Sequence, residues 1–158
     1  VALIKGLKNK GFSASIKYPN DIIIDNKKVA GILTDCIIAG GVRYCVVGVG
    51  LNVNNHTLNP GLNQVTSLYK IQKRSIDIYS LFSLILLEID HYILNVKDIR
   101  SVYLSNLIGF KKLTACVFMG SNIFLKILSL SNKGLLTIET QKGVVHTVSG
   151  QDVKFLLE

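Results

Sequence analysis

The sequence predicts an α+β fold, in which helices cover a mixed, largely antiparallel sheet and a small β-barrel follows at the C-terminal end. Between residues 13 and 51, segments rich in β-branched residues are joined by short turns, and short turns favour antiparallel neighbours. Two segments with helical apolar spacing come next. After residue 112, short strand-like segments alternate with tight-turn residues at the regular spacing of a small barrel.

The chain is expected to begin with a helix and to continue into the sheet. Val1 to Lys8 has helical apolar spacing, and Gly11 suits a left-handed C-terminal cap. We expect this helix to be cut, because the chain starts with valine instead of methionine. The predicted strands are Ser13 to Lys17, Ile22 to Ile24, Lys28 to Ile38 and Arg43 to Leu51, and the predicted turns are Asp25-Asn26 and Ala39-Gly40-Gly41.

A loop and two helices are expected after these strands. Asn52 to Gln64 is rich in Asn, Gly and Pro, which predicts a surface loop in a position where loops often cover ligands. Ser75 is the predicted N-cap of a long helix that runs through Leu94. A shorter helix is expected from Lys97 to Leu107, ended by Gly109, and the helices should cover one face of the sheet.

The barrel is predicted from five short strands. They are Leu113 to Met119, Asn122 to Leu130, Leu135 to Gln141, Val144 to Val148 and Val153 to Leu157. We therefore place a domain boundary near Phe110, with one domain over residues 1–109 and a second over residues 110–158. A domain of about 45 residues is at the low end of independent stability, so the barrel should dock on the first domain.

Composition indicates a soluble globular protein in the cytoplasm. The longest apolar region, Ile76 to Leu94, is interrupted by charged residues, so no membrane span is expected. The cysteines are Cys36, Cys45 and Cys116, an odd number without metal-ligand spacing. They predict buried thiols in a reducing compartment, with no catalytic role and no metal site.

The net charge of +8 admits more than one interpretation. It could indicate an acidic partner or a nucleic acid. The lysines are spread along the chain as single residues or pairs, however, which favours a solvated basic surface. A basic nucleic-acid-binding module therefore stays open as an alternative, supported by the charge alone.

The strongest candidate for chemistry is the segment Lys17-Tyr18-Pro19-Asn20-Asp21, followed by Lys28-Val29-Ala30-Gly31-Ile32-Leu33. Pro19 fixes its own backbone, and Asn and Asp after proline are also ordinary turn residues. A hairpin turn at Asp25-Asn26 would return Lys28 beside Asp21, so that a carboxylate and an ammonium share one site. Gly31 in a β-branched strand usually indicates a bulge or the close approach of a ligand.

A second candidate is Gly48-Val49-Gly50-Leu51-Asn52-Val53-Asn54 at the end of the last strand of the sheet. Residues two apart share a face of a strand, so the two glycines form a flat strip on which a planar ring could lie. The asparagine amides could contact the edge of a heterocycle. A Gly-x-Gly pattern is common, and the third glycine of a dinucleotide-binding motif is missing.

In this order, and together with Thr66-Ser67-Leu68, these segments resemble the second half of biotin protein ligases. Tyr18 stands where that family usually has tryptophan. The resemblance implies the class II synthetase-like catalytic fold without its N-terminal part, and a C-terminal SH3-like barrel. It also implies an ATP-dependent ligase that forms biotinyl-5′-AMP from ATP and biotin, with Mg²⁺, and transfers biotin to one lysine of a biotin carboxyl carrier protein such as that of acetyl-CoA carboxylase.

The resemblance implies roles for individual residues. Lys28, Asp21 and Asn20 are the implied catalytic residues: Lys28 contacts the biotin carboxylate and the α-phosphate, Asp21 orients or deprotonates the acceptor lysine, and Asn20 helps to fix the adenylate. The implied biotin pocket comprises Lys28, Gly31, Leu33, Gly48 and Gly50. The implied ATP and adenylate contacts come from Lys17, Asn20, Lys28 and Asn52, and no protein metal site is implied.

The sequence departs from the family at one point. The Gly- and Arg-rich loop that closes over biotin and adenylate should lie upstream of Lys17, and the only arginines are Arg43, Arg74 and Arg100. We therefore expect a C-terminal fragment that is inactive in isolation. Without a winged DNA-binding segment, no DNA partner is expected; no membrane partner is expected either, and a homodimer is left open. A lipoate ligase, which shares the fold, is the enzymatic alternative.

Overall fold

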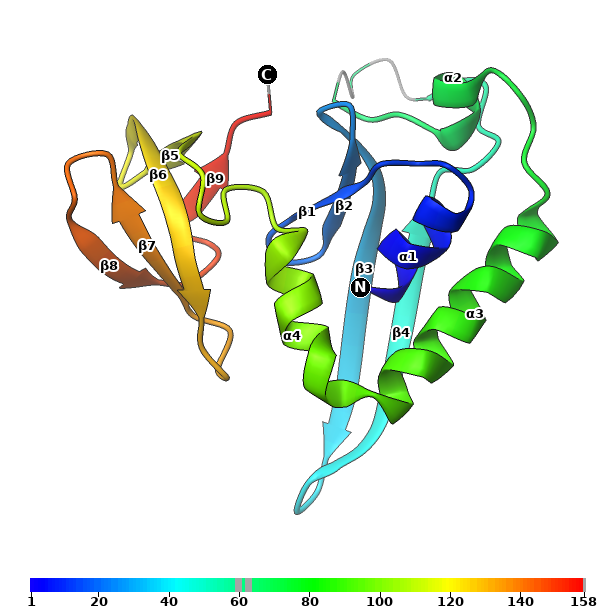
Figure 1. Cartoon of the computed structure of the whole chain (residues 1–158), viewed down its shortest axis with the longest axis horizontal. Coiled ribbons are helices and arrows are strands. Elements are labelled where there is room, and N and C mark those ends of the chain that lie inside the picture. The colour runs from blue at the N-terminus through cyan, green and yellow to red at the C-terminus, as the bar shows by residue number, and fades with distance from the viewer. Residues whose placement is uncertain (59–60, 62–63, 158) are drawn as a thin grey trace.

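The computed structural model describes residues 1–58, 61 and 64–157, apart from the side chain of Asp98. The helices are α1 (Ala2–Asn9), α2 (Leu68–Gln72), α3 (Ile78–Leu94) and α4 (Val96–Ser105). The strands are β1 (Ser15–Lys17), β2 (Asp21–Ile24), β3 (Lys27–Ile38), β4 (Val42–Leu51), β5 (Thr114–Phe118), β6 (Ser121–Leu130), β7 (Leu136–Thr140), β8 (Val145–Val148) and β9 (Val153–Phe155). They form two sheets, which Figure 1 shows side by side.

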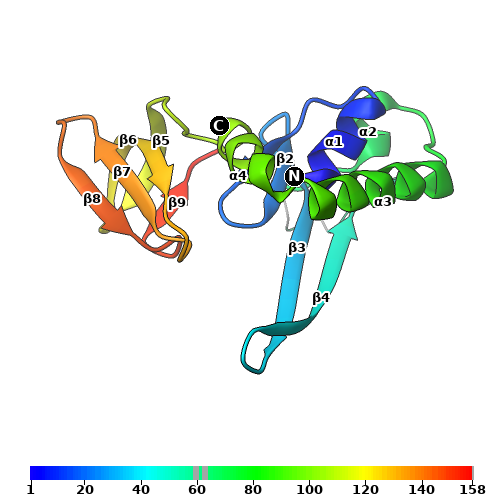
Figure 2. The ribbon, with the colours of Figure 1, turned by 60° about the horizontal axis from the view of Figure 1, so that its bottom comes forward.

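The first sheet is a four-stranded antiparallel meander in the order β1-β2-β3-β4. Helices α1 and α3 lie on one side of β3 and β4 (Figure 2). Leu3, Leu7 and Leu81 from these helices and Val29 from β3 are fully or almost fully buried in the shared core. The α+β class and the antiparallel order are thus confirmed, and helices cover one face as expected.

The second sheet is antiparallel, with five strands in the order β8-β7-β6-β5-β9. Its alternate residues point inward, and Leu125, Ile127, Leu136 and Ile138 are each 0% exposed. Two strands separate β5 from β8 in the sheet, yet the ring centroids of Phe118 on β5 and His146 on β8 are only 5.3 Å apart. The sheet is therefore strongly curled. This curl agrees with the barrel expected from the sequence.

A short connector after α4 joins the two sheets. Ile16 of β1 exchanges backbone hydrogen bonds with it, through Asn106 and Ile108, both at 2.8 Å. On the other side the amide of Ile127 in β6 donates to the carbonyl of Gly109 at 2.7 Å. The boundary predicted near Phe110 falls in this connector and stays a prediction.

Several predicted boundaries of the helices need correction. The N-cap of α3 is Asp77 and not Ser75, because the Asp77 carboxylate accepts hydrogen bonds from the amides of Tyr79 and Ser80. The sequence interpretation also missed α2, whose N-cap is Ser67. The predicted loop from Asn52 to Gln64 is described only in part, because residues 59, 60, 62 and 63 lie outside the described residues.

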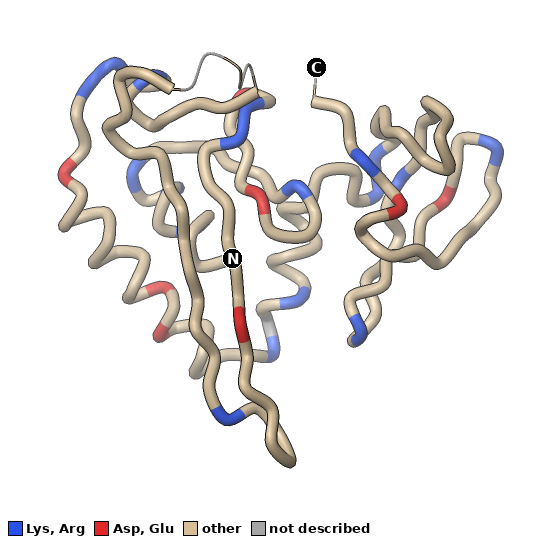
Figure 3. Tube along the Cα trace, turned by 180° about the vertical axis from the view of Figure 1, so that it is seen from behind, with Lys and Arg blue, Asp and Glu red and all other residues tan. Residues whose placement is uncertain are grey.

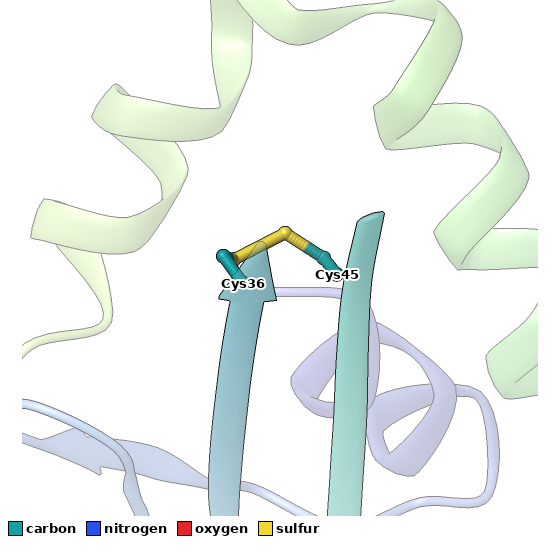
Figure 4. The surroundings of a disulfide bond; sticks show 2 residues. All are labelled: Cys36 and Cys45. Atoms are coloured by element: carbon teal, nitrogen blue, oxygen red, sulfur yellow. A yellow bond between two sulfur atoms is a disulfide. The ribbon is translucent and has the colours of Figure 1, made fainter. Parts of the chain in front are cut away.

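The expectation of buried thiols is wrong for two of the three cysteines. Cys36 and Cys45 are directly opposite in the β3–β4 register, are exposed, and form a disulfide (Figure 4). No pattern in the sequence indicates that this part of the hairpin is exposed. Cys116 is buried as expected, and burial raises the pKa of its thiol. The compartment predicted from free thiols stays a prediction.

The basic residues of the chain do not gather in one place. Lysines and arginines are distributed along the whole trace (Figure 3), in agreement with a solvated basic surface. None of the helices in the described part of the chain has the length and apolar character that crossing a membrane requires.

Leu7→Ala should lower the free energy of unfolding by about 2–5 kcal/mol, because it leaves a cavity where α1 packs on the sheet. Leu7 is 0% exposed, whereas Leu94 at the end of α3 is 82% exposed. Leu94→Ala is therefore the control, with an expected change within about 0.5 kcal/mol. Urea unfolding followed by circular dichroism measures both, and equal effects would contradict the described core.

Candidate functional site

The β2–β3 hairpin brings Asp21 and Lys28 into contact. Asp25 and Asn26 form its turn with φ values of 49° and 59°, the left-handed conformation that a two-residue type I′ turn requires and that Asp and Asn tolerate. The Lys28 Nζ lies 2.6 Å from Asp21 Oδ1. The proximity expected from the sequence is therefore present in the structure.

A β-bulge at Val29 decides which face of β3 carries Lys28. Ile22 pairs with Ala30 and Ile23 pairs with Lys28, so Val29 is an extra residue on β3. Lys28 and Gly31 are three residues apart and would point to opposite faces of a regular strand. The extra residue at Val29 shifts the alternation of side chains by one position. Lys28 and Gly31 therefore lie on the same face of the sheet, which is also the face of Asp21.

Backbone hydrogen bonds from neighbouring segments hold the bulge. The Val29 carbonyl accepts from the amide of Asn52 at 2.9 Å. The Lys28 amide donates to the carbonyl of Gln64 at 2.8 Å, and its carbonyl accepts from the amide of Thr66 at 2.9 Å. The Thr66-Ser67-Leu68 segment thus holds the backbone of Lys28 through the Thr66 amide. This contact gives the segment a structural role in the site.

Gly31 lies directly beneath the ion pair. A Cβ atom built at Gly31 would be 3.2 Å from Lys28 Nζ, 3.3 Å from its Cε and 3.5 Å from Asp21 Oδ1. Any side chain at Gly31 would therefore displace the ammonium. The glycine is explained by the ion pair itself.

Four of the predicted site residues form one row across the first sheet. Lys17 pairs with Asp21, Asp21 with Gly31, and Gly31 with Gly50, so the row includes one residue from each strand. Leu33 pairs with Gly48 on the same face of β3 and β4. This face is opposite to the one that packs toward α3, because Val47, Val49 and Leu51 of β4 point to that helix.

The glycines of β4 leave this face flat. A Cβ at Gly48 would meet only the Leu33 carbonyl at 3.8 Å, and one at Gly50 only the Gly31 carbonyl at 3.9 Å. Both are ordinary van der Waals distances, so the described residues do not require glycine at either position. A flat strip beside an ammonium and a carboxylate suits a ligand with a planar, apolar part and an anionic end.

The two predicted asparagines make hydrogen bonds within the chain. Asn20 Nδ2 donates to the Ile32 carbonyl at 2.7 Å, and the Ile32 amide donates to the Asn20 carbonyl at 3.1 Å. Asn52 Nδ2 donates to the Thr66 carbonyl at 3.2 Å. Each amide nitrogen thus holds the backbone of the site, and the Oδ1 atoms are the side-chain groups that these bonds leave for a ligand.

Two tyrosines connect the site to the second sheet. Tyr18 donates its hydroxyl hydrogen to the Gly134 carbonyl and lies against Gly150, where no Cβ could be accommodated. The Tyr103 hydroxyl donates to the Pro19 carbonyl at 2.9 Å. Burial, and to a lesser extent the nearby Tyr18, raises the pKa of Tyr103, so this phenol stays protonated as a donor.

Sequence reasoning assigned no role to Tyr103 and treated Tyr18 only as an aromatic replacement. The contact of Tyr18 with the second sheet was not predictable, because Gly134 and Gly150 look like ordinary turn residues in the sequence. The described residues also contain no group of three or more His, Cys, Asp or Glu side chains placed to hold a metal ion.

Comparisons with known proteins agree with these observations. Residues 1–52 match the family model described as Biotin/lipoate A/B protein ligase family. The bifunctional ligase/repressor BirA of Bacillus spizizenii is 29% identical over 154 residues, which cover 91% of this chain and 47% of that protein. The chain therefore spans about half the length of the curated relatives that it matches.

Solved structures show the same fold. The apo structure of the biotin protein ligase from Aquifex aeolicus matches 99% of this chain and 72% of its own, with a TM-score of 0.75 and 22% identity. The structure of that ligase in complex with biotin and ATP also has a TM-score of 0.75, with 21% identity, over 99% of this chain and 68% of its own. The resemblance to biotin protein ligases and the predicted fold class are confirmed, whereas the roles of individual residues are not tested.

Gly31→Ala should shift the Lys28 ammonium and leave the fold intact. The added methyl meets the flexible end of the lysine side chain, so the ammonium moves while the backbone stays in place. A crystal structure of the variant should show Lys28 Nζ displaced away from position 31 by a few tenths of an ångström. Gly48→Ala is the matched control, and an unmoved ammonium in Gly31→Ala would refute the steric argument.

Tyr103→Phe should destabilise the protein by about 0.5–1.5 kcal/mol, because the Pro19 carbonyl loses its hydrogen-bond donor. Tyr79→Phe is a suitable control, since Tyr79 is 85% exposed. Thermal unfolding of the two variants measures the difference. If both variants unfold at the same temperature, the Tyr103 contact with Pro19 does not contribute to stability.

Proposed function

We propose that this chain, whose residues 1–52 match the model of the biotin/lipoate A/B protein ligase family, carries the adenylation and transfer residues of a biotin protein ligase. The observation that supports this most directly is the Lys28–Asp21 ion pair above Gly31, at the end of a flat glycine strip. The solved structures named above are of a biotin protein ligase, one of them in complex with biotin and ATP, so biotin is favoured over lipoate.

The proposed reaction has two steps. The biotin carboxylate attacks the α-phosphorus of ATP, which forms the acyl phosphate bond of biotinyl-5′-AMP and breaks the bond to pyrophosphate. The ε-amine of a lysine on a biotin carboxyl carrier protein then attacks the acyl carbon. An amide forms, AMP leaves, and the amine loses a proton. The first step needs a cation and the second needs a base.

Lys28 is proposed to supply the cation. Its side chain is 42% exposed, so the ammonium is accessible to a ligand on the open face. An ion pair this exposed contributes about 1 kcal/mol or less, so an incoming carboxylate or phosphate can take the place of Asp21. Lys28 would then stabilise the charge of the α-phosphate as pyrophosphate leaves.

Asp21 is proposed to act in the transfer step. When Lys28 moves to the phosphate, the Asp21 carboxylate is released beside it, close to where the acyl carbon would lie. A carboxylate there can orient the ε-ammonium of the acceptor and accept its proton, which an amine with a pKa near 10.4 must lose. One ion pair would thus serve both steps in turn.

The remaining predicted residues are proposed to position the substrates. Gly31, Leu33, Gly48 and Gly50 would border biotin on the flat face, while Lys17, Asn20 and Asn52 would contact the adenylate. Mg²⁺ is proposed as a companion of ATP, because phosphate oxygens are ligands that this cation prefers. The net charge of +8 suits an acidic carrier domain as the second substrate.

Lys28→Ala should weaken binding of biotinyl-5′-AMP by at least about tenfold, because the phosphate loses a charged donor. Isothermal titration calorimetry of this chain with biotinyl-5′-AMP measures the change. Lys27→Ala is the matched control, since Lys27 is the exposed neighbour on the same strand. Equal affinity for Lys28→Ala and the unaltered chain would refute the assignment of Lys28.

Asp21→Asn should slow the transfer of biotin from preformed biotinyl-5′-AMP to a carrier domain by about 10²-fold or more and weaken adenylate binding little. Transfer is followed by mass spectrometry of the carrier, in a ligase polypeptide that includes this chain. Asp25→Asn, in the turn of the same hairpin, is the control. Unimpaired transfer by Asp21→Asn would show that another group accepts the proton.

A further inference from the structure

The turn that leads into Asp21 is held from outside its own sheet. It consists of residues 18–20 and joins β1 to β2, which are strands of three and four residues. Asn20 is hydrogen-bonded to β3 through its backbone and its side chain. Tyr18 and Pro19, by contrast, are hydrogen-bonded to the second sheet and to α4. The segment that carries the proposed transfer residue therefore joins three parts of the molecule.

The ring of Tyr18 lies against two turns of the second sheet. Its hydroxyl donates to the carbonyl of Gly134, in the turn between β6 and β7. Gly134 has a φ of 77°, a conformation that favours glycine, and its amide donates to the Ser131 carbonyl at 3.1 Å. In the turn between β8 and β9, a Cβ at Gly150 would lie 2.6 Å from Tyr18 Cδ1, which is too close for real atoms. Both turns therefore contact the same side chain.

Helix α4 contacts the same region and lies between the two sheets (Figures 1 and 2). The Tyr103 hydroxyl donates to the Pro19 carbonyl at 2.9 Å. One turn earlier in the helix, Arg100 Nη1 donates to Asn132 Oδ1 at 2.7 Å, in the same β6–β7 turn as Gly134. The β1–β2 turn and the β6–β7 turn are therefore held by one helix as well as by each other.

We propose that Tyr18 is a positioning residue for the transfer step. Its hydroxyl bond to Gly134 fixes the β1–β2 turn, and the turn holds the Asp21 carboxylate where it accepts the proton of the acceptor lysine. This inference rests on the proposed function, because it takes Asp21 as the group that acts in transfer. A misplacement of about 1 Å can lower the rate of a catalysed step by about 10²-fold, so the rate depends on how firmly this turn is held.

Lys28 is held by different contacts. Its backbone amide and carbonyl are hydrogen-bonded to Gln64 and Thr66, and the β-bulge in β3 determines the face to which it points. None of these contacts belongs to the β1–β2 turn. Loss of the Tyr18 hydroxyl should therefore disturb Asp21 and leave Lys28 in place, which separates the transfer step from the binding of the adenylate.

A purely structural role is the competing explanation. The Tyr18 hydroxyl would then join the two sheets and have no influence on Asp21. Such a role predicts less folded protein but an unchanged rate for each folded molecule, whereas a positioning role predicts a lower rate for each folded molecule. Counting the sites that bind biotinyl-5′-AMP distinguishes the two explanations.

The test is Tyr18→Phe in a ligase polypeptide that includes this chain, because this substitution removes one hydroxyl and keeps the ring. For transfer from biotinyl-5′-AMP to a carrier domain, kcat per adenylate-binding site should fall about tenfold. KM for the carrier and Kd for biotinyl-5′-AMP should change less than about twofold. Tyr79→Phe is the control, since Tyr79 is 85% exposed. An unchanged kcat, or an equal loss of kcat and of adenylate affinity, would overturn the proposal.

A second variant perturbs Tyr18 from the second sheet. The methyl group of Gly150→Ala would overlap the Tyr18 ring, so the ring must move. This variant should also lower kcat for transfer by about tenfold, although residue 150 belongs to neither strand of the proposed active site. Gln151→Ala, an exposed neighbour in the same turn, is the matched control and should change kcat less than about twofold. Equal rates for the two variants would contradict the positioning role.

Backbone ¹⁵N relaxation measures the motion of the turn directly. In Tyr18→Phe, the order parameters of the Asn20 and Asp21 amides should fall from about 0.85 toward about 0.6, while that of Lys28 stays unchanged. A purely structural contact would not produce this difference between the two halves of the ion pair. Unchanged order parameters at both Asn20 and Asp21 would overturn the proposal.

Failure of this proposal is distinguishable from failure of the proposed function. Impaired transfer by Asp21→Asn together with normal transfer by Tyr18→Phe would reject the positioning role and leave the proposed function intact. Normal transfer by Asp21→Asn would reject the role of Asp21 in transfer, and the positioning role with it. Absence of transfer by the unaltered ligase polypeptide would reject the proposed function itself.

Discussion

The geometry of the site depends on the single extra residue at Val29. Without it, strand alternation would place Lys28 on the face that packs toward the helices, and Gly31 would lie under no ion pair. The bulge is held by backbone bonds from Asn52, at the end of β4, and its flanking residue Lys28 is held by the segment around Thr66. Residues that are distant in the sequence therefore determine where one ammonium points.

The two faces of the first sheet have different functions because of this arrangement. One face supplies the core, where alternate residues of β3 and β4 pack toward α1 and α3. The other face has glycine at positions 31, 48 and 50 and carries the Lys28–Asp21 ion pair. Glycine weakens a strand; the ion pair explains Gly31, and close approach of a ligand would explain Gly48 and Gly50, which no described residue requires to be glycine.

The sequence was sufficient for features that depend on local pattern. The type I′ turn at Asp25-Asn26 and the alternation in β3 and β4 predict the hairpin and the meeting of Asp21 with Lys28. It was insufficient where tertiary context decides. Asp77 is the N-cap of α3 because its carboxylate accepts hydrogen bonds from two backbone amides. Cys36 and Cys45 are exposed because no segment of the described chain covers their hairpin. The contacts of Tyr18 with the second sheet depend on a docking that no local pattern encodes.

That docking gives the second sheet a physical role in the site. Tyr18 and Pro19 immediately precede Asn20 and Asp21, and both are held from outside the first sheet, Tyr18 by Gly134 and Gly150 and Pro19 by Tyr103. A turn between two short strands has few contacts of its own and would otherwise be mobile. Because Asp21 begins β2 directly after this turn, the second sheet and α4 limit the motion of the carboxylate that Lys28 contacts. The position of the charged pair is therefore set by the bulge on the Lys28 side, and on the Asp21 side by the contacts of Tyr18 with the second sheet and of Pro19 with α4.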